Sequence, residues 1–218
     1  MKNSIGRFVP QQFKPFVSSS DYNNHKRKLI DEKKRTDGFT MLQSVSDMFD
    51  KLNITDGMTL SFHHHLRNGD FVLNAVAEEI KRRDIKNLKL APSSIFPSNA
   101  ILVELMENGN VTDIYTDYVN GPVAEAISKG KLKGMCVMHT HGGRPMAIES
   151  GELHIDVAIL ATPTVDAKGN GTGFIGKSAC GSMGYAESDL RYADKVVLVT
   201  DNMVDSIENP QLDGSYVD

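Results

Sequence analysis

The chain has 218 residues, of which 40% are hydrophobic and 24% charged, and its formal net charge is -4. This length and composition are typical of a globular domain that buries its core without a metal or a disulfide. The negative charge argues against nucleic acid as a partner, and no stretch approaches the roughly 20 apolar residues of a membrane helix. Cys136 and Cys180 have no framework spacing, which indicates reduced thiols in a cytoplasmic protein.

Residues 1–37 differ in composition from the rest of the chain. They contain two prolines, three consecutive serines and a charged cluster between His25 and Arg35. Such a segment lacks the apolar residues of a core, so we expect an extended, partly disordered arm. A single α/β domain is expected over residues 38–218.

Beyond residue 38, short apolar segments alternate with segments of helical periodicity. The apolar segments predict strands at residues 58–62, 87–91, 111–116, 134–138, 155–161 and 195–200. The segments between them predict helices at residues 39–52, 71–83, 99–107, 122–128, 145–150 and 185–192. This alternation predicts an open, mostly parallel sheet with helices on both faces. Ligands of such sheets bind beyond the carboxyl ends of the strands, so the loops that follow strands are the candidate sites.

Three consecutive histidines, His63, His64 and His65, follow the first predicted strand, and Arg67 lies two residues further on. In a loop, their imidazoles can donate hydrogen bonds to a carboxylate or to a developing oxyanion. A metal site needs ligands that converge on one point, which adjacent residues do poorly, so no metal is predicted. The alternative is a loop that is merely polar.

A second polar loop follows the strand at 134–138. Gly142 and Gly143 let the backbone approach a ligand, and a helix begins nearby whose amino end favours an anion. His141 adds a hydrogen-bonding imidazole, and Arg144 adds a guanidinium suited to a bidentate grip on a carboxylate. The alternative is a glycine turn with exposed histidines.

A third loop, residues 166–181, is rich in glycine and follows the strand at 155–161. It could lie against a phosphate or a pantetheine-like arm. Residues 171–178 match the phosphate-binding loop pattern literally, but no long helix opens after them, so nucleoside triphosphate binding is not predicted. The candidate contact residues are Asn170, Gly171, Thr172, Gly173 and Lys177.

Taken together, these loops resemble the citrate lyase alpha chain family, a branch of the coenzyme A transferases. The resembling segments lie in the family's order at residues 56–67, 90–94, 141–144, 154–158 and 180–185. The resemblance runs from about residue 38 to 202 and is most specific at the triple histidine. The family's fold has two similar α/β halves, so the chain is expected to form the first, coenzyme A transferase-like half.

The resemblance implies an enzyme, a transferase that exchanges acetyl for citryl on a carrier thioester and releases acetate, the first step of citrate cleavage. It implies as partners the citrate lyase beta chain, the acyl carrier protein (gamma chain) and the second half of the alpha chain, in a cytoplasmic oligomer. The reacting thiol belongs to the coenzyme A-like, phosphopantetheine-type group of the acyl carrier protein, and no cofactor is expected to be bound covalently in this chain. In related transferases an acyl anhydride forms on a glutamate of the second half, and no glutamate here is a convincing acceptor.

In this scheme His63, His64 and His65 polarise the thioester carbonyl. The loop at residues 170–177 lies against the carrier arm. Alternatives are a coenzyme A transferase for another small acid, a non-catalytic sensor on the same fold, and a metal hydrolase. The residues expected to bind citrate are Arg67, His141, Gly142, Gly143 and Arg144.

Overall fold

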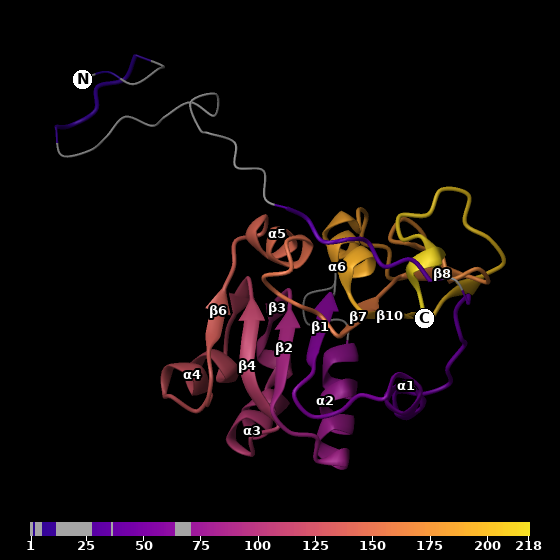
Figure 1. The fold of residues 1–218 in the computed structure, drawn as a ribbon, viewed down its shortest axis with the longest axis horizontal. Coiled ribbons are helices and arrows are strands. Elements are labelled where there is room, and N and C mark those ends of the chain that lie inside the picture. Colours follow the sequence, from indigo (N-terminus) through magenta and orange to yellow (C-terminus); the bar gives the residue numbers. More distant parts are fainter. Residues whose placement is uncertain (1, 3–5, 12–27, 36, 64–70) are drawn as a thin grey trace.

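The computed structural model describes residue 2 and residues 6–11, 28–35, 37–63 and 71–218 (Figure 1). The predictions made for His64, His65 and Arg67 lie outside these residues. None of the helices in the described ranges is long and apolar enough to cross a membrane.

The main sheet has six strands that all run parallel, in the order β10-β7-β1-β2-β4-β6. The strands are β1 (Thr59–His63), β2 (Leu88–Pro92), β4 (Val111–Thr116), β6 (Cys136–Met138), β7 (Val157–Ala161) and β10 (Lys195–Val199). The chain starts at a central strand, builds outward to β6 and then returns to the other side of β1. The strand order therefore reverses between β1 and β7, which is where sheets of this type bind ligands. The predicted open parallel sheet is confirmed.

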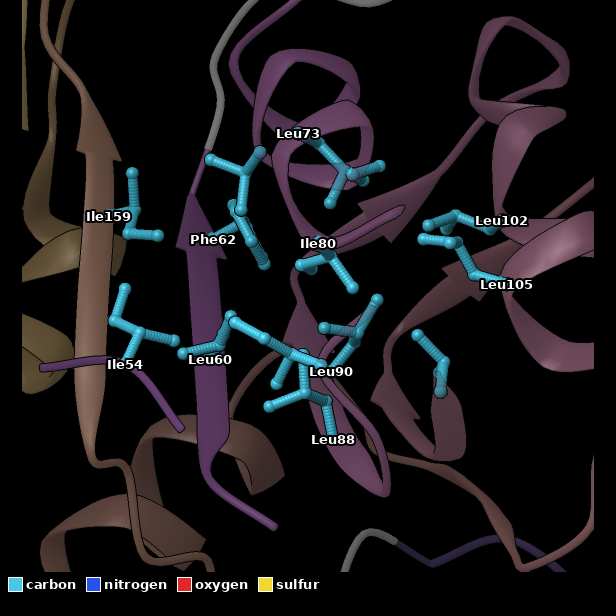
Figure 2. Packing of buried hydrophobic residues seen from close by; sticks show 14 of the residues in the cluster. Ile54, Leu60, Phe62, Leu73, Ile80, Leu88, Leu90, Leu102, Leu105 and Ile159 are labelled. Atoms are coloured by element: carbon cyan, nitrogen blue, oxygen red, sulfur yellow. The ribbon is translucent and has the colours of Figure 1, made fainter. Parts of the chain in front are cut away.

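Helices cover both faces of this sheet, as predicted. In β1, Leu60 and Phe62 point into one core, which they share with residues of the first four helices (Figure 2). In β7, Ala158 and Leu160 point into the other core, where they pack with residues of the last two helices. The helices are α1 (Val45–Leu52), α2 (Val72–Arg83), α3 (Ile101–Glu107) and α4 (Pro122–Ser128) on the first face, and α5 (Gly143–Glu149) and α6 (Glu187–Tyr192) on the second.

The helix predicted from residue 39 begins later, at Val45. Its start is fixed by Ser44, whose side chain accepts a hydrogen bond from the Asp47 amide (3.1 Å). Such a cap satisfies an amide that has no partner within the helix. Phe39 and Leu42 continue the apolar pattern but lie ahead of the cap, so periodicity alone placed the boundary too early.

The structure also contains short strands that were not predicted. They are β3 (Ser94–Ile95), β5 (Tyr118–Val119), β8 (Thr164–Asp166), β9 (Gly171–Thr172) and β11 (Met203–Val204). β8 and β9 pair antiparallel, so part of the glycine-rich third loop is a hairpin. Segments of two or three residues are too short to show a period of two in sequence.

Part of the predicted arm packs on the domain. The Ile30, Lys33 and Arg35 amides donate hydrogen bonds of 2.9, 2.8 and 2.7 Å to carbonyls in α5, in α6 and near the carboxyl end of the chain. The described residues 28–35 form no helix or strand. They lie along α5 and α6, and so they cover part of the second face.

Candidate functional site

Tyr185 lies at the centre of a cluster of polar side chains at the carboxyl ends of the strands. It belongs to a short 3-10 helix, Gly184–Ala186, that leads into α6. The His63 ring, at the end of β1, lies 4.9 Å from the Tyr185 ring, and the His141 ring, just after β6, lies 5.7 Å from it (centroid distances). His63 and His141, which follow different strands, therefore meet at one edge of the sheet.

Asp117 joins this cluster from a third strand end, directly after β4. Its carboxylate accepts a hydrogen bond from the Tyr185 hydroxyl and lies 3.8 Å from Nδ1 of His141. Burial raises the pKa of the Asp117 carboxyl, although Tyr185, Arg144 and His141 oppose the effect. Burial, together with the hydrogen bond to Asp117, also raises the pKa of the Tyr185 hydroxyl, so Tyr185 stays neutral over the physiological range.

Arg144 lies beneath this cluster and does not reach solvent. Its guanidinium is fully buried and donates two hydrogen bonds to Asp189 of α6, of 2.8 and 2.9 Å. It also donates to Ser61 Oγ (2.6 Å) and to the Ala91 carbonyl (2.8 Å), and its Cζ lies 5.7 Å from the Tyr185 ring centroid. Burial opposes the charge, but Asp189 outweighs it and the pKa of Arg144 is raised.

The prediction that Arg144 grips a ligand carboxylate is therefore corrected. A guanidinium that is fully buried and already bidentate to Asp189 has no accessible face for a second carboxylate. Arg144 instead ties α5 to α6 and to the central strands, and thereby supports the Tyr185 ring from below. The sequence showed a residue suited to carboxylate recognition but could not show that the carboxylate is Asp189.

The double-glycine turn is closed by Thr140. The Gly143 amide donates to the Thr140 carbonyl (2.9 Å) and to its hydroxyl (3.0 Å), so this amide is used within the turn. Gly142 is exposed, and a side chain added there would meet open space. The approach of the backbone to a ligand remains a prediction for Gly142, whereas a Cβ at Gly143 would lie 2.8 Å from Thr140 Oγ1.

Three candidate residues of the third loop make hydrogen bonds with residues 211–214 near the carboxyl end of the chain. They are Asn170, Gly171 and Thr172. Asn170 Oδ1 accepts from the Gly214 amide (2.9 Å), and Gly171 exchanges backbone hydrogen bonds with Leu212. The Thr172 hydroxyl donates to the side-chain oxygen of residue 211 (3.3 Å). These groups have partners within the domain, and their role against a carrier arm remains a prediction.

The Gly173 amide likewise donates to Gln211 Oε1 (2.7 Å), so among these candidates Lys177 alone is exposed. The Gly173 carbonyl accepts from the amides of Cys180 and Gly181 (both 2.9 Å), which folds the loop back toward Tyr185. Lys177 is exposed at the tip of this fold. Its ammonium group is therefore accessible to an anionic group outside the domain.

Asp117, Tyr185 and Asp189 were not among the predicted site residues. Asp117 directly follows a predicted strand, and this position was the signal that could have identified it. Tyr185 lies in a segment that carries the family resemblance, but an aromatic residue that follows a glycine has no distinctive pattern. Asp189 sits inside a helix and could be recognised only through its contact with Arg144.

A separate group, His154, Asp156 and Asp194, has ligand atoms within 4.8 Å of one another in the described part of the chain. It lies just before β7 and β10, at the amino ends of the strands and away from Tyr185. The three side chains are partly exposed, and Lys33 already pairs with Asp194. We assign no metal to it.

Comparison with known proteins agrees with this geometry. The family model "Citrate lyase, alpha subunit" matches residues 39–215. The citrate lyase alpha chain of Haemophilus influenzae is 48% identical over 167 residues, and that of Klebsiella pneumoniae is 43% identical over 162 residues. These matches cover 77% and 74% of this chain but 33% and 32% of the relatives, so the chain spans about a third of their length.

Among solved structures, the alpha subunit of citrate lyase from Streptococcus mutans in complex with citrate superposes with a TM-score of 0.83 at 36% identity. That match covers all of this chain and 44% of the other. An acyl-CoA transferase from Escherichia coli, solved as a thioester complex with coenzyme A, superposes with a TM-score of 0.58 at 12% identity over 86% of this chain and 48% of the other. The second likeness shows that the fold is shared with coenzyme A transferases. The match over most of the chain shows that it belongs to the citrate lyase alpha subunit family.

Proposed function

We propose that this chain forms one wall of an acyl-exchange site, in which citrate replaces acetate on the thioester of an acyl carrier protein. The observation that carries the proposal is the meeting of His63, His141 and Tyr185 at the point where the strand order reverses. Family membership supplies the reaction, and the citrate bound to the S. mutans relative supports the choice of acid.

The protein has two tasks in this exchange. It must hold a tricarboxylate out of water, and it must stabilise the negative charge that develops on the thioester carbonyl oxygen. Imidazoles at the strand ends can donate to both kinds of oxygen. His63 and His141 both lie close to Tyr185 and can divide these tasks. We propose that His64 and His65 assist at the thioester carbonyl and that Arg67 assists in binding citrate.

We propose that the acyl-accepting glutamate lies in the part of the family's longer chains that this sequence does not match. The carrier's prosthetic group is proposed as a phosphopantetheine-type arm that passes near Lys177, where an ammonium group can meet a phosphate. The beta chain and the acyl carrier protein are the proposed partners in an oligomeric complex.

Complementation tests the proposal. The chain is mixed with the remaining two thirds of the H. influenzae alpha chain, and acetate released from an acetyl-carrier thioester is measured with citrate and with a panel of other small acids. His63→Ala is expected to lower citrate-dependent release about 100- to 1,000-fold, the usual effect of losing one oxyanion donor. His154→Ala, at the opposite end of the sheet, is the matched control and should leave the rate unchanged.

Two outcomes argue against this function. A His63→Ala protein that exchanges citrate at the wild-type rate removes the proposed carbonyl donor. Release that is faster with another acid than with citrate identifies a different coenzyme A transferase on the same scaffold. Calorimetry with citrate and the chain alone adds a direct measure of binding.

A further inference from the structure

Asp117 combines deep burial with an unmet hydrogen-bonding capacity. Its side chain is 2% exposed, and its backbone amide donates to the Ser93 carbonyl (3.2 Å), which fixes the residue at the end of the sheet. One carboxylate oxygen accepts the Tyr185 hydroxyl proton, while Oδ1 is buried and has no hydrogen-bond partner among the residues that the structure describes. The carboxylate is thus only partly satisfied within the described part of the domain, and it can accept further hydrogen bonds in addition to the one from Tyr185.

The groups that face Asp117 come from every element packed around it, and they are neutral donors or cationic groups. Tyr185 reaches it from the 3-10 helix, Arg144 acts from α5, and His139 and His141 act from the segment after β6. Tyr185 is itself held between the His63 ring and the Arg144 guanidinium. The carboxylate therefore lies among groups that can donate hydrogen bonds to it or attract its charge.

His141 is the solvent-accessible member of this group. Its side chain is 87% exposed, and Nδ1 lies 3.8 Å from Oδ2 of Asp117. A shift of about 1 Å brings these atoms into hydrogen-bond range. The two ring nitrogens lie on different edges of an imidazole. When Nδ1 of His141 is directed at Asp117, Nε2 is therefore directed away from Asp117.

We propose that Asp117 is the positioning residue of His141, accepting its Nδ1 proton so that Nε2 is presented to a ligand carboxylate beyond the strand ends. The hydrogen bond at one ring nitrogen decides which nitrogen carries the proton. In the neutral ring the proton is on Nδ1. With a proton on both ring nitrogens, Nε2–H donates to an anionic ligand while Nδ1–H donates to Asp117. The inference deepens the proposed function, because the carboxylate concerned is that of citrate.

The tautomer of His141 tests this directly in the whole chain and without an activity assay. Imidazole ¹⁵N chemical shifts measured at about pH 8.5, where an ordinary histidine is neutral, distinguish Nδ1–H from Nε2–H. The wild-type chain should show His141 mainly as Nδ1–H, and Asp117→Asn should make Nε2–H the main form. His154 serves as an internal control, because its signals should be the same in both proteins if the variant is folded.

Citrate binding, measured by calorimetry on the same samples, should be about tenfold weaker in Asp117→Asn, as expected for a misdirected hydrogen bond to a charged group. The proposal is overturned if wild-type His141 is mainly Nε2–H, or if Asp117→Asn leaves its tautomer unchanged. Failure of wild-type chain to bind citrate would instead contradict the proposed function, and the tautomer result would still decide the geometry of the pair.

Discussion

The buried ion pair between Arg144 and Asp189 allows a quantitative prediction. Both side chains are 0% exposed, and the guanidinium makes two bonds to the carboxylate and one each to Ser61 Oγ and the Ala91 carbonyl. Removing one charge leaves the other buried without compensation. Arg144→Met or Asp189→Leu alone should therefore lower the free energy of unfolding by about 3–5 kcal/mol.

The double variant should lose no more than either single variant. With both charges gone, no ion is stranded, and Ser61 Oγ can still donate to the Ala91 carbonyl, a contact of 3.2 Å in the wild type. Neighbouring residues of one network are expected to be non-additive in this way. The exposed pair of Lys129 and Glu125, 3.6 Å apart, supplies a control, since Glu125→Gln should leave stability unchanged within error.

Urea denaturation, followed by circular dichroism, is applied to the wild-type chain, the two single variants, the double variant and the control. Unfolding free energies are taken from the midpoint and slope of each curve. Equal slopes show that the variants unfold from comparable states. Single variants within about 1 kcal/mol of wild type would refute the reasoning, because a stranded buried charge is expected to be far more destabilising. A double variant that loses the sum of the two single losses would refute it as well.

Three further predictions concern packing, pH and capping. Gly173→Ala should destabilise the domain by about 1–3 kcal/mol in urea denaturation, because its Cβ would meet the Gly181 carbonyl oxygen at 2.3 Å, whereas Gly142→Ala, facing open space, should be neutral. Hydrogen bonds from Arg82, helped by Arg83, lower the pKa of Glu79 from 4.5 to about 2. The stabilising effect of the Glu79 carboxylate is therefore present above pH 4.5 and lost as pH falls toward 2. Glu79→Gln should flatten the fall in urea midpoint over that range. Ser44→Ala should lower the unfolding free energy by about 1 kcal/mol, and an unchanged melting temperature would contradict its capping role.

The sequence by itself determined the main sheet and the end of the sheet at which to look for function. The strands predicted at residues 58–62, 87–91 and 111–116 agree with β1, β2 and β4 to within one residue at either end, because apolar runs bounded by turn residues leave few other conformations. Parallel strands share a carboxyl edge, so His63 at the end of β1 and His141 after β6 had to lie on the same side of the sheet. Their meeting around one aromatic ring is consistent with that argument.

Only the tertiary structure decided what each polar side chain does. Arg144 is suited by its chemistry to a ligand carboxylate, yet the carboxylate it binds is Asp189, 45 residues away. The position of Asp117 after a predicted strand marked it only as one of many loop residues, and its significance comes from burial and from two partners that approach it from other elements. Amino-acid type fixes which hydrogen bonds a group can make, but packing selects the partners that are distant in sequence. The local sequence pattern therefore identified the edge of the sheet and not the hydrogen-bond network within it.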